Sequence, residues 1–150
     1  MSARPDSLMG CLRGGRHILP LRVYYEDTDA GGLVYYANYL KFMERARTEW
    51  LRSLGFEQDR LRDEESVLFV VRQASLDFLC PARFNDALAV SARVTRRGRA
   101  SLSFQQQVRN PQNERLVYCS GEVKLACIDA QGFRPRPIPE RLLAEMPDVE

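Results

Sequence analysis

The chain has 150 residues, of which 45% are apolar and 28% are charged, and its formal net charge is +2. This length and composition suffice for one globular domain with a core of its own. So small a net charge does not argue for nucleic-acid or membrane binding, and no apolar run approaches the roughly 20 residues that cross a bilayer. Neither a nucleic-acid partner nor a membrane span is expected.

Residues 1–19 are rich in Gly, Arg and Ser and show no periodicity, so we interpret them as a flexible leader ahead of one domain over residues 20–150. His17, the one histidine of the chain, falls in this leader and is expected outside the core. A Ser-His-Asp or Cys-His mechanism and a histidine zinc site are therefore not expected. Catalysis would have to use carboxylates, backbone dipoles, hydroxyls or arginine, with no metal and no cofactor.

A first strand and a long helix follow the leader. Pro20 opens a β-rich run at Leu21–Tyr25, which predicts a strand. Apolar residues then recur at spacings of three and four, which predicts a helix from about Asn38 to Leu54 with one buried stripe. Gly55 supplies a stop, and a short charged helix is expected over about 57–64. The stripe consists of Tyr39, Phe42, Met43, Ala46, Trp50 and Leu54.

From Val67 onward the pattern predicts strands and turns, ending in a short C-terminal helix after three prolines. Because no second β-to-α crossover appears, a doubly wound parallel sheet is excluded. We expect an α+β fold in which a curved antiparallel sheet wraps around one buried helix. The expected strands cover residues 67–71 and 74–79, which are separated by a bend, then 87–95, 101–109 and 116–128.

The spacing and location of the cysteines indicate reduced thiols rather than disulfides or a metal site. They show no C-x-x-C spacing, and three of the four lie in or at the end of apolar runs, where a thiol acts as a small hydrophobe. We therefore expect a cytoplasmic protein. The four residues are Cys11, Cys80, Cys119 and Cys127.

The segment 25–39 contains the candidate catalytic groups. It places two carboxylates, Asp27 and Asp29, ahead of the paired glycines Gly31 and Gly32 and the start of the long helix. A carboxylate beside backbone N–H donors at a helix N-terminus can attack an activated acyl group directly, or it can activate a water molecule that hydrolyses this group. The same pattern also suits an aspartate that only shapes a turn.

The spacing of this segment resembles the 4-hydroxybenzoyl-CoA thioesterase-like hotdog proteins, and among them the acyl-CoA thioesterases associated with the Tol-Pal system. The similarity covers about residues 21–128 and includes the turn at 81–86. It implies a hotdog fold, an acyl-CoA substrate, and a homodimer or homotetramer with sites at the subunit boundary, to which the segment 69–78 contributes. The motif reads Asp27-x-Asp29-x-x-Gly32-x-Val34-Tyr35-x-x-x-Tyr39, followed by Phe42, Glu44, Ala46 and Arg47.

The resemblance also implies roles for single residues. Asp29 corresponds to the catalytic aspartate, as nucleophile or general base, and the backbone N–H of Tyr36 corresponds to the donor that polarises the thioester carbonyl. Relatives often carry histidine where this chain has Tyr36. Asp27 is the second candidate and more simply holds the loop, while Glu44 is a weaker one that could reach the same cleft or pair with an arginine. Arg96, Arg97 and Arg99 match loosely the residues that bind coenzyme A phosphates.

Two other functions compete with acyl-CoA hydrolysis. A hotdog hydratase or dehydratase in the familiar cases uses a histidine, and only His17 is present. A non-catalytic module that binds acyl-CoA or acyl carrier protein is the main alternative. The sequence identifies neither the acyl group nor the carrier, coenzyme A or acyl carrier protein.

Overall fold

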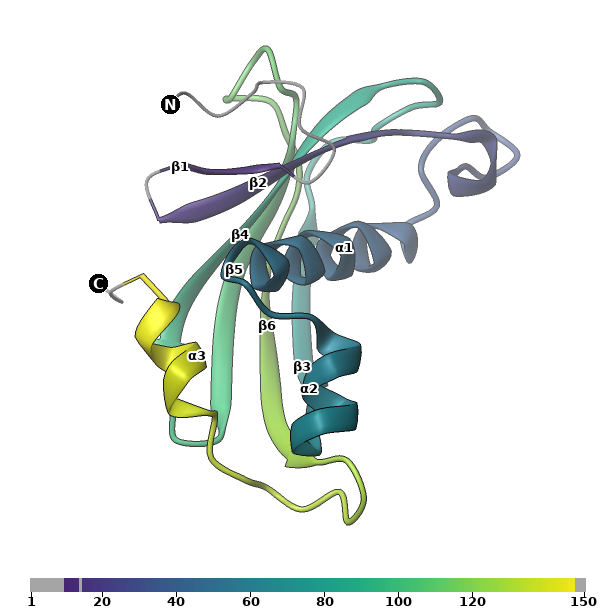
Figure 1. The fold of residues 1–150 in the computed structure, drawn as a ribbon. Coiled ribbons are helices and arrows are strands. Elements are labelled where there is room, and N and C mark those ends of the chain that lie inside the picture. Colours follow the sequence, from purple (N-terminus) through teal and green to yellow (C-terminus); the bar gives the residue numbers. More distant parts are fainter. Residues whose placement is uncertain (1–9, 14, 148–150) are drawn as a thin grey trace.

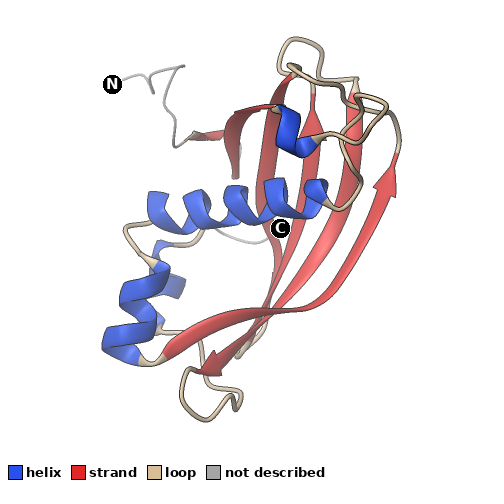
Figure 2. Ribbon diagram, turned by 90° about the vertical axis from the view of Figure 1, so that its right-hand side faces the viewer, coloured by secondary structure: helices blue, strands red, loops and turns tan. Residues whose placement is uncertain are grey.

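The computed structural model describes residues 10–13 and 15–147, and residues 1–9 of the predicted leader lie outside this part. One antiparallel sheet of six strands curves around a long helix, α1, which lies on its concave face (Figures 1 and 2). The expected α+β fold is confirmed. The strands follow the order β1-β2-β4-β5-β6-β3 and are β1 (Cys11–Arg13), β2 (Arg16–Arg22), β3 (Val67–Phe78), β4 (Ala87–Arg97), β5 (Ser101–Arg109) and β6 (Val117–Asp129).

Helix α1 (Asn38–Ser53) matches the predicted helix closely. The predicted stripe packs onto β2, β4 and β5, and Phe42, Met43 and Ala46 are fully buried there because the 3.6-residue period keeps them on one face. The helix ends as the pattern predicts, since Gly55 adopts a φ of +94°, a conformation that other residues rarely take.

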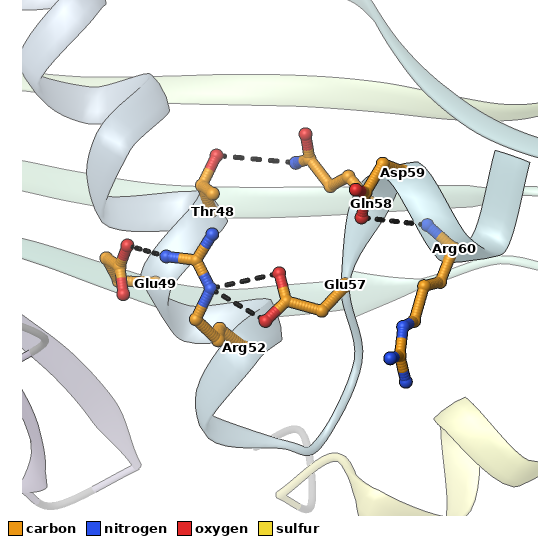
Figure 3. A network of polar contacts seen from close by, with 7 residues as sticks. All are labelled: Thr48, Glu49, Arg52, Glu57, Gln58, Asp59 and Arg60. Carbon is orange, nitrogen blue, oxygen red and sulfur yellow. Dashed lines mark hydrogen bonds and ion pairs between the residues drawn. The ribbon is translucent and has the colours of Figure 1, made fainter.

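A short helix, α2 (Gln58–Glu65), follows α1, and α3 (Glu140–Glu145) lies near the C-terminus. Arg52 fixes the turn between α1 and α2, because its Nε donates to the Glu57 carboxylate at 3.0 Å and its Nη1 donates to Glu49 (Figure 3). A further bond, from Gln58 Nε2 to Thr48 Oγ1 at 3.4 Å, ties the first residue of α2 back to α1.

Two expectations for the N-terminal region are wrong. The strand predicted at Leu21–Tyr25 instead runs from Arg16 to Arg22, and Tyr25–Asp27 is a turn of 3₁₀ helix. His17 is not outside the core: it pairs with Ala92 across β2 and β4 and is only 1% exposed. Residues 16–19 thus belong to the sheet.

Strand β3 forms one edge of the sheet, since it pairs only with β6. Its register shifts between Val71 and Gln73, at the predicted bend. Several apolar side chains along and just after this edge lie open to solvent. These are Val70, Val71, Phe78 and Leu79, which are 37%, 53%, 52% and 60% exposed.

Candidate active site

The loop between β2 and α1 is closed by its own backbone. The Asp29 N–H donates to Leu33 O at 2.8 Å, and the Gly32 N–H donates to Asp29 O at 3.1 Å. Gly32 has a φ of +78°, which explains why glycine follows the aspartate here. The loop is anchored to the segment after β3 by Val34 N–H to Ala82 O, 2.9 Å, so the position of Asp29 is fixed relative to the sheet.

Asp29 is exposed, and its two carboxylate oxygens differ. Oδ1 accepts the Gly31 N–H at 2.9 Å and the Leu33 N–H at 3.3 Å. Across the part of the chain that the structure describes, no donor is bonded to Oδ2. One oxygen therefore sets the orientation of the carboxylate, and the other can meet a substrate or a water molecule.

Asp27 has a different environment and is 6% exposed. Its Oδ2 accepts the Tyr24 N–H at 2.9 Å, and its backbone oxygen accepts both the Tyr35 N–H at 2.9 Å and Asn38 Nδ2 at 2.8 Å. These bonds join the 3₁₀ turn to the start of α1. Asp27 thus shapes the loop that carries Asp29.

A backbone N–H just before α1 is left without a partner among the described residues, as is common at helix N-termini. Tyr36 lies two residues before Asn38, the first residue of α1. Its backbone N–H has no acceptor within the described residues. An N–H of this kind, near the positive end of a helix dipole, can polarise a carbonyl oxygen.

Asp29 and Tyr36 line the same cleft, of about 380 Å³. Aromatic rings form much of its wall: the Phe78 ring lies 5.9 Å from that of Tyr36 and 5.8 Å from that of Tyr39. The Tyr39 hydroxyl accepts the Ala82 N–H at 3.2 Å, and burial raises its pKa, so it remains a neutral phenol. The other lining residues are Leu33, Val34, Tyr35, Leu79, Cys80 and Pro81.

Phe78 and Leu79 were not among the predicted site residues, although the segment 69–78 was expected at the acyl pocket. Their signal in the sequence is weak, because a large apolar residue at the end of a strand usually packs into the core. Their placement depends on β3 being an edge strand, which only the tertiary structure shows.

Glu44 does not line the cleft that contains Asp29. It is exposed on α1 and borders a second pocket together with Arg47. The three predicted arginines are also distant from Asp29. Arg96, Arg97 and Arg99 surround the β4–β5 turn, at the Val70 end of the sheet, whereas the cleft lies at the Phe78 end. Eight residues of β3 separate these ends, about 27 Å at 3.4 Å per residue.

Among residues 10–13 and 15–147, no group of three or more His, Cys, Asp or Glu side chains could hold a metal ion. No helix in the described part of the chain is long and apolar enough to span a bilayer. The three cysteines whose side chains are described, Cys80, Cys119 and Cys127, are free thiols.

Comparison with known proteins identifies the family of the chain. The model of the thioesterase-like superfamily matches residues 23–146. An acyl-CoA thioester hydrolase, YbgC, of Escherichia coli is 44% identical over 84% of this chain and 92% of its own length, and the acyl-CoA thioesterase YbgC of Haemophilus influenzae is 42% identical over 83% and 90%. A crystal structure of a probable thioesterase from Bartonella henselae superposes with a TM-score of 0.77 at 33% identity, covering 83% of this chain and 99% of that one.

The chain therefore belongs to the thioesterase-like superfamily and has its hotdog fold. It is an enzyme of the thioester hydrolase class.

Proposed function

We propose that the protein hydrolyses acyl-CoA thioesters, with Asp29 as the reacting carboxylate. The observation that carries this proposal is the cleft that Asp29 and Tyr36 both line. The relatives named above as acyl-CoA thioesterases support the choice of carrier. Acyl carrier protein is the alternative carrier, and activity on matched acyl-CoA and acyl-carrier thioesters separates the two.

The proposed reaction needs only these groups because a thioester is already activated. The carbonyl carbon is attacked either by Asp29 Oδ2 or by a water molecule that Asp29 deprotonates, while the Tyr36 N–H donates to the developing oxyanion. The C–S bond breaks, and the thiolate takes up a proton as it leaves. In the first route water then hydrolyses an acyl-aspartyl anhydride, whereas in the second the acid forms directly.

Both routes use the same geometry, and mass spectrometry separates them. Acid quenching during turnover traps an anhydride as an acyl adduct on the peptide that contains Asp29. The nucleophilic route predicts this adduct, and the general-base route predicts unmodified peptide at every time point.

We further propose that two copies pair through β3 to give a homodimer, which can pair again to a tetramer. The edge of β3 offers a row of unpaired backbone groups, and Val71, Phe78 and Leu79 expose apolar surface along it. Antiparallel pairing about a two-fold axis reverses the second sheet. The arginine-bearing turn of the second copy then comes to the Phe78 end of the first.

This reversal gives Arg96, Arg97 and Arg99 a role that they cannot have within one chain. Coenzyme A is long and carries phosphates, so its acyl end can lie beside Asp29 of one copy while arginines of the other bind its phosphates. Exchange of all three arginines for glutamine should raise KM and leave kcat nearly unchanged, because the phosphates bind equally in ground and transition states.

The test of the proposed function is thiol release across a panel of acyl-CoA chain lengths, which also identifies the acyl group. Asp29→Asn should abolish release, and Glu26→Gln, at an exposed neighbouring carboxylate, is the matched control. Tight binding of every thioester by the unchanged chain with no thiol released would instead establish the binding module.

Two finer expectations remain proposals. Free thiols at Cys80, Cys119 and Cys127 support a cytoplasmic location, where thiols stay reduced. An association with the Tol-Pal system rests on the sequence resemblance alone, and co-purification with tagged components of that system is its test.

A further inference from the structure

A second pocket, of about 130 Å³, lies further along α1 and shares no lining residue with the cleft of Asp29. Arg47, on its wall, follows Tyr39 of the first cleft by eight residues, about 12 Å along the helix axis. The pocket is bordered by Glu44, Arg47, Trp50, Leu51, Gln58, Phe69, Val71, Leu102, Phe104 and Leu125.

Arg47 is a buried cation that forms no ion pair with the residues that the structure describes. It is 8% exposed, and its Nη1 donates to Gln106 Oε1 at 2.8 Å. Within the described residues no carboxylate oxygen lies within 4.0 Å of its nitrogens. Burial lowers the pKa of this guanidinium, and the charge of Glu44 opposes that shift only in part. A buried charge held by one neutral amide is costly unless an anion joins it.

Gln106 cannot stabilise the charge of Arg47 any further, because its amide already makes other hydrogen bonds. It is fully buried, and its Nε2 donates to Met43 O at 3.0 Å and to Ser91 O at 3.2 Å. This amide therefore holds the guanidinium in a fixed position beside the pocket.

A second buried donor lies on the same face of α1. Trp50 follows Arg47 by three residues and is 2% exposed. Its indole Nε1–H has no acceptor in the described part of the chain, and its ring meets Phe104 edge to face with centroids 4.9 Å apart. Both side chains line the pocket, and one of them is charged.

Most of the remaining lining residues are apolar, and the space is small. Leu51, Phe69 and Leu125 contribute hydrocarbon surface, and the volume approaches the roughly 150 Å³ of an apolar cavity that holds benzene. Glu44 is exposed, so water solvates its charge, whereas Arg47 is only 8% exposed and keeps little of its hydration. Gln58 is held in place by its bond to Thr48 (Figure 3).

We propose that this pocket binds a small apolar carboxylic acid, with its carboxylate on Arg47 and Trp50 Nε1–H and its hydrocarbon body on the apolar walls. An anion there supplies the missing charge and accepts the unpaired indole proton. The link to catalysis rests on the proposed function, since thioester hydrolysis releases acids of this class. The binding site itself does not involve Asp29.

Benzoate is the probe, and benzamide, its neutral isostere, is the control ligand. Calorimetry on the full chain should show that benzoate binds, and that benzamide binds at least about tenfold more weakly than benzoate. Arg47→Met should weaken benzoate at least about tenfold, and Trp50→Phe, which keeps the ring shape, should weaken it several-fold. Circular dichroism verifies that both variants fold.

Asp29→Asn separates this site from the catalytic one, because it should bind benzoate like the unchanged protein even where hydrolysis is lost. Equal affinity of Arg47→Met and the unchanged chain for benzoate would overturn the proposal, as would the absence of binding at millimolar benzoate. If benzoate fails to bind and Arg47→Met weakens self-association, the missing anion is a carboxylate of a second copy, which also overturns it.

Discussion

Replacement of Asp27 by alanine tests the division of labour between the two carboxylates. The change removes the acceptor of the Tyr24 N–H, a 2.9 Å bond at a residue that is 6% exposed. A donor left unsatisfied in a partly buried place costs about 1–3 kcal/mol. Taking about 2 kcal/mol, and about 2–4 °C per kcal/mol for a domain of this size, Tm should fall by about 4–8 °C.

Calorimetry measures the Tm, and thiol release is measured well below it. Asp27→Asn keeps one carboxamide oxygen as acceptor, so it should lose less stability and retain most of its kcat. If Asp27→Asn melts like the unchanged protein but releases no thiol, Asp27 is the reacting group and the assignment of roles is refuted.

Four further predictions concern stability, thiol reactivity and assembly. Gly121→Ala should lower the free energy of unfolding in urea by about 1–3 kcal/mol, since a β-carbon there would lie 2.7 Å from the Ser75 carbonyl oxygen; an unchanged midpoint would contradict the β3–β6 packing. Burial raises the pKa of the Cys119 thiol from 9.0 to about 11, so the folded state holds this proton more tightly and stability should fall as pH rises from about 9 to about 11. In a Cys11→Ser background, alkylation at pH 8 should modify the half-buried Cys80 before Cys119, and equal rates would disprove the burial. Val70→Lys, on the open edge, should shift sedimentation toward the monomer and reduce thiol release with it, whereas an unchanged dimer would exclude β3 as the interface.

Local patterns were sufficient to predict most of the fold. Helix α1 was predicted because Phe42, Met43 and Ala46 repeat at the helical period and Gly55 ends it. The strands after Val67 followed from β-rich runs between turn residues.

The first strand was misplaced because Pro20 suggested a beginning. Pro20 instead lies inside β2. The pairing of β2 with β1 ends at Ile18, so no β1 residue faces Pro20. The missing N–H of Pro20 therefore costs no hydrogen bond to β1. Tyr24 and Tyr25 are β-formers, but the Asp27 carboxylate caps the Tyr24 N–H and turns the chain. His17 could not be placed, because the residues around it show no periodicity and its burial depends on pairing with Ala92, far along the sequence.

The candidate site was only partly accessible from the sequence. Asp29 and Tyr36 are close in the chain, so a local motif is enough to associate them. Phe78 joins them only through the path of β3. In the proposed homodimer, the relation of Arg99 to Asp29 would depend on the second copy. The burial of Arg47 depends on Gln106, 59 residues away in the sequence, so no local pattern reveals it.

The central claim is that Asp29 reacts in the chemical step. The direct measurement is single-turnover hydrolysis by rapid quench, with enzyme in excess over a thioester that the chain turns over, for the unchanged protein and for Asp29→Asn. The account predicts that the variant binds the thioester but hydrolyses it at least about 100-fold more slowly, as expected when a nucleophile or general base is lost. A single-turnover rate within a few-fold of the unchanged protein would contradict it.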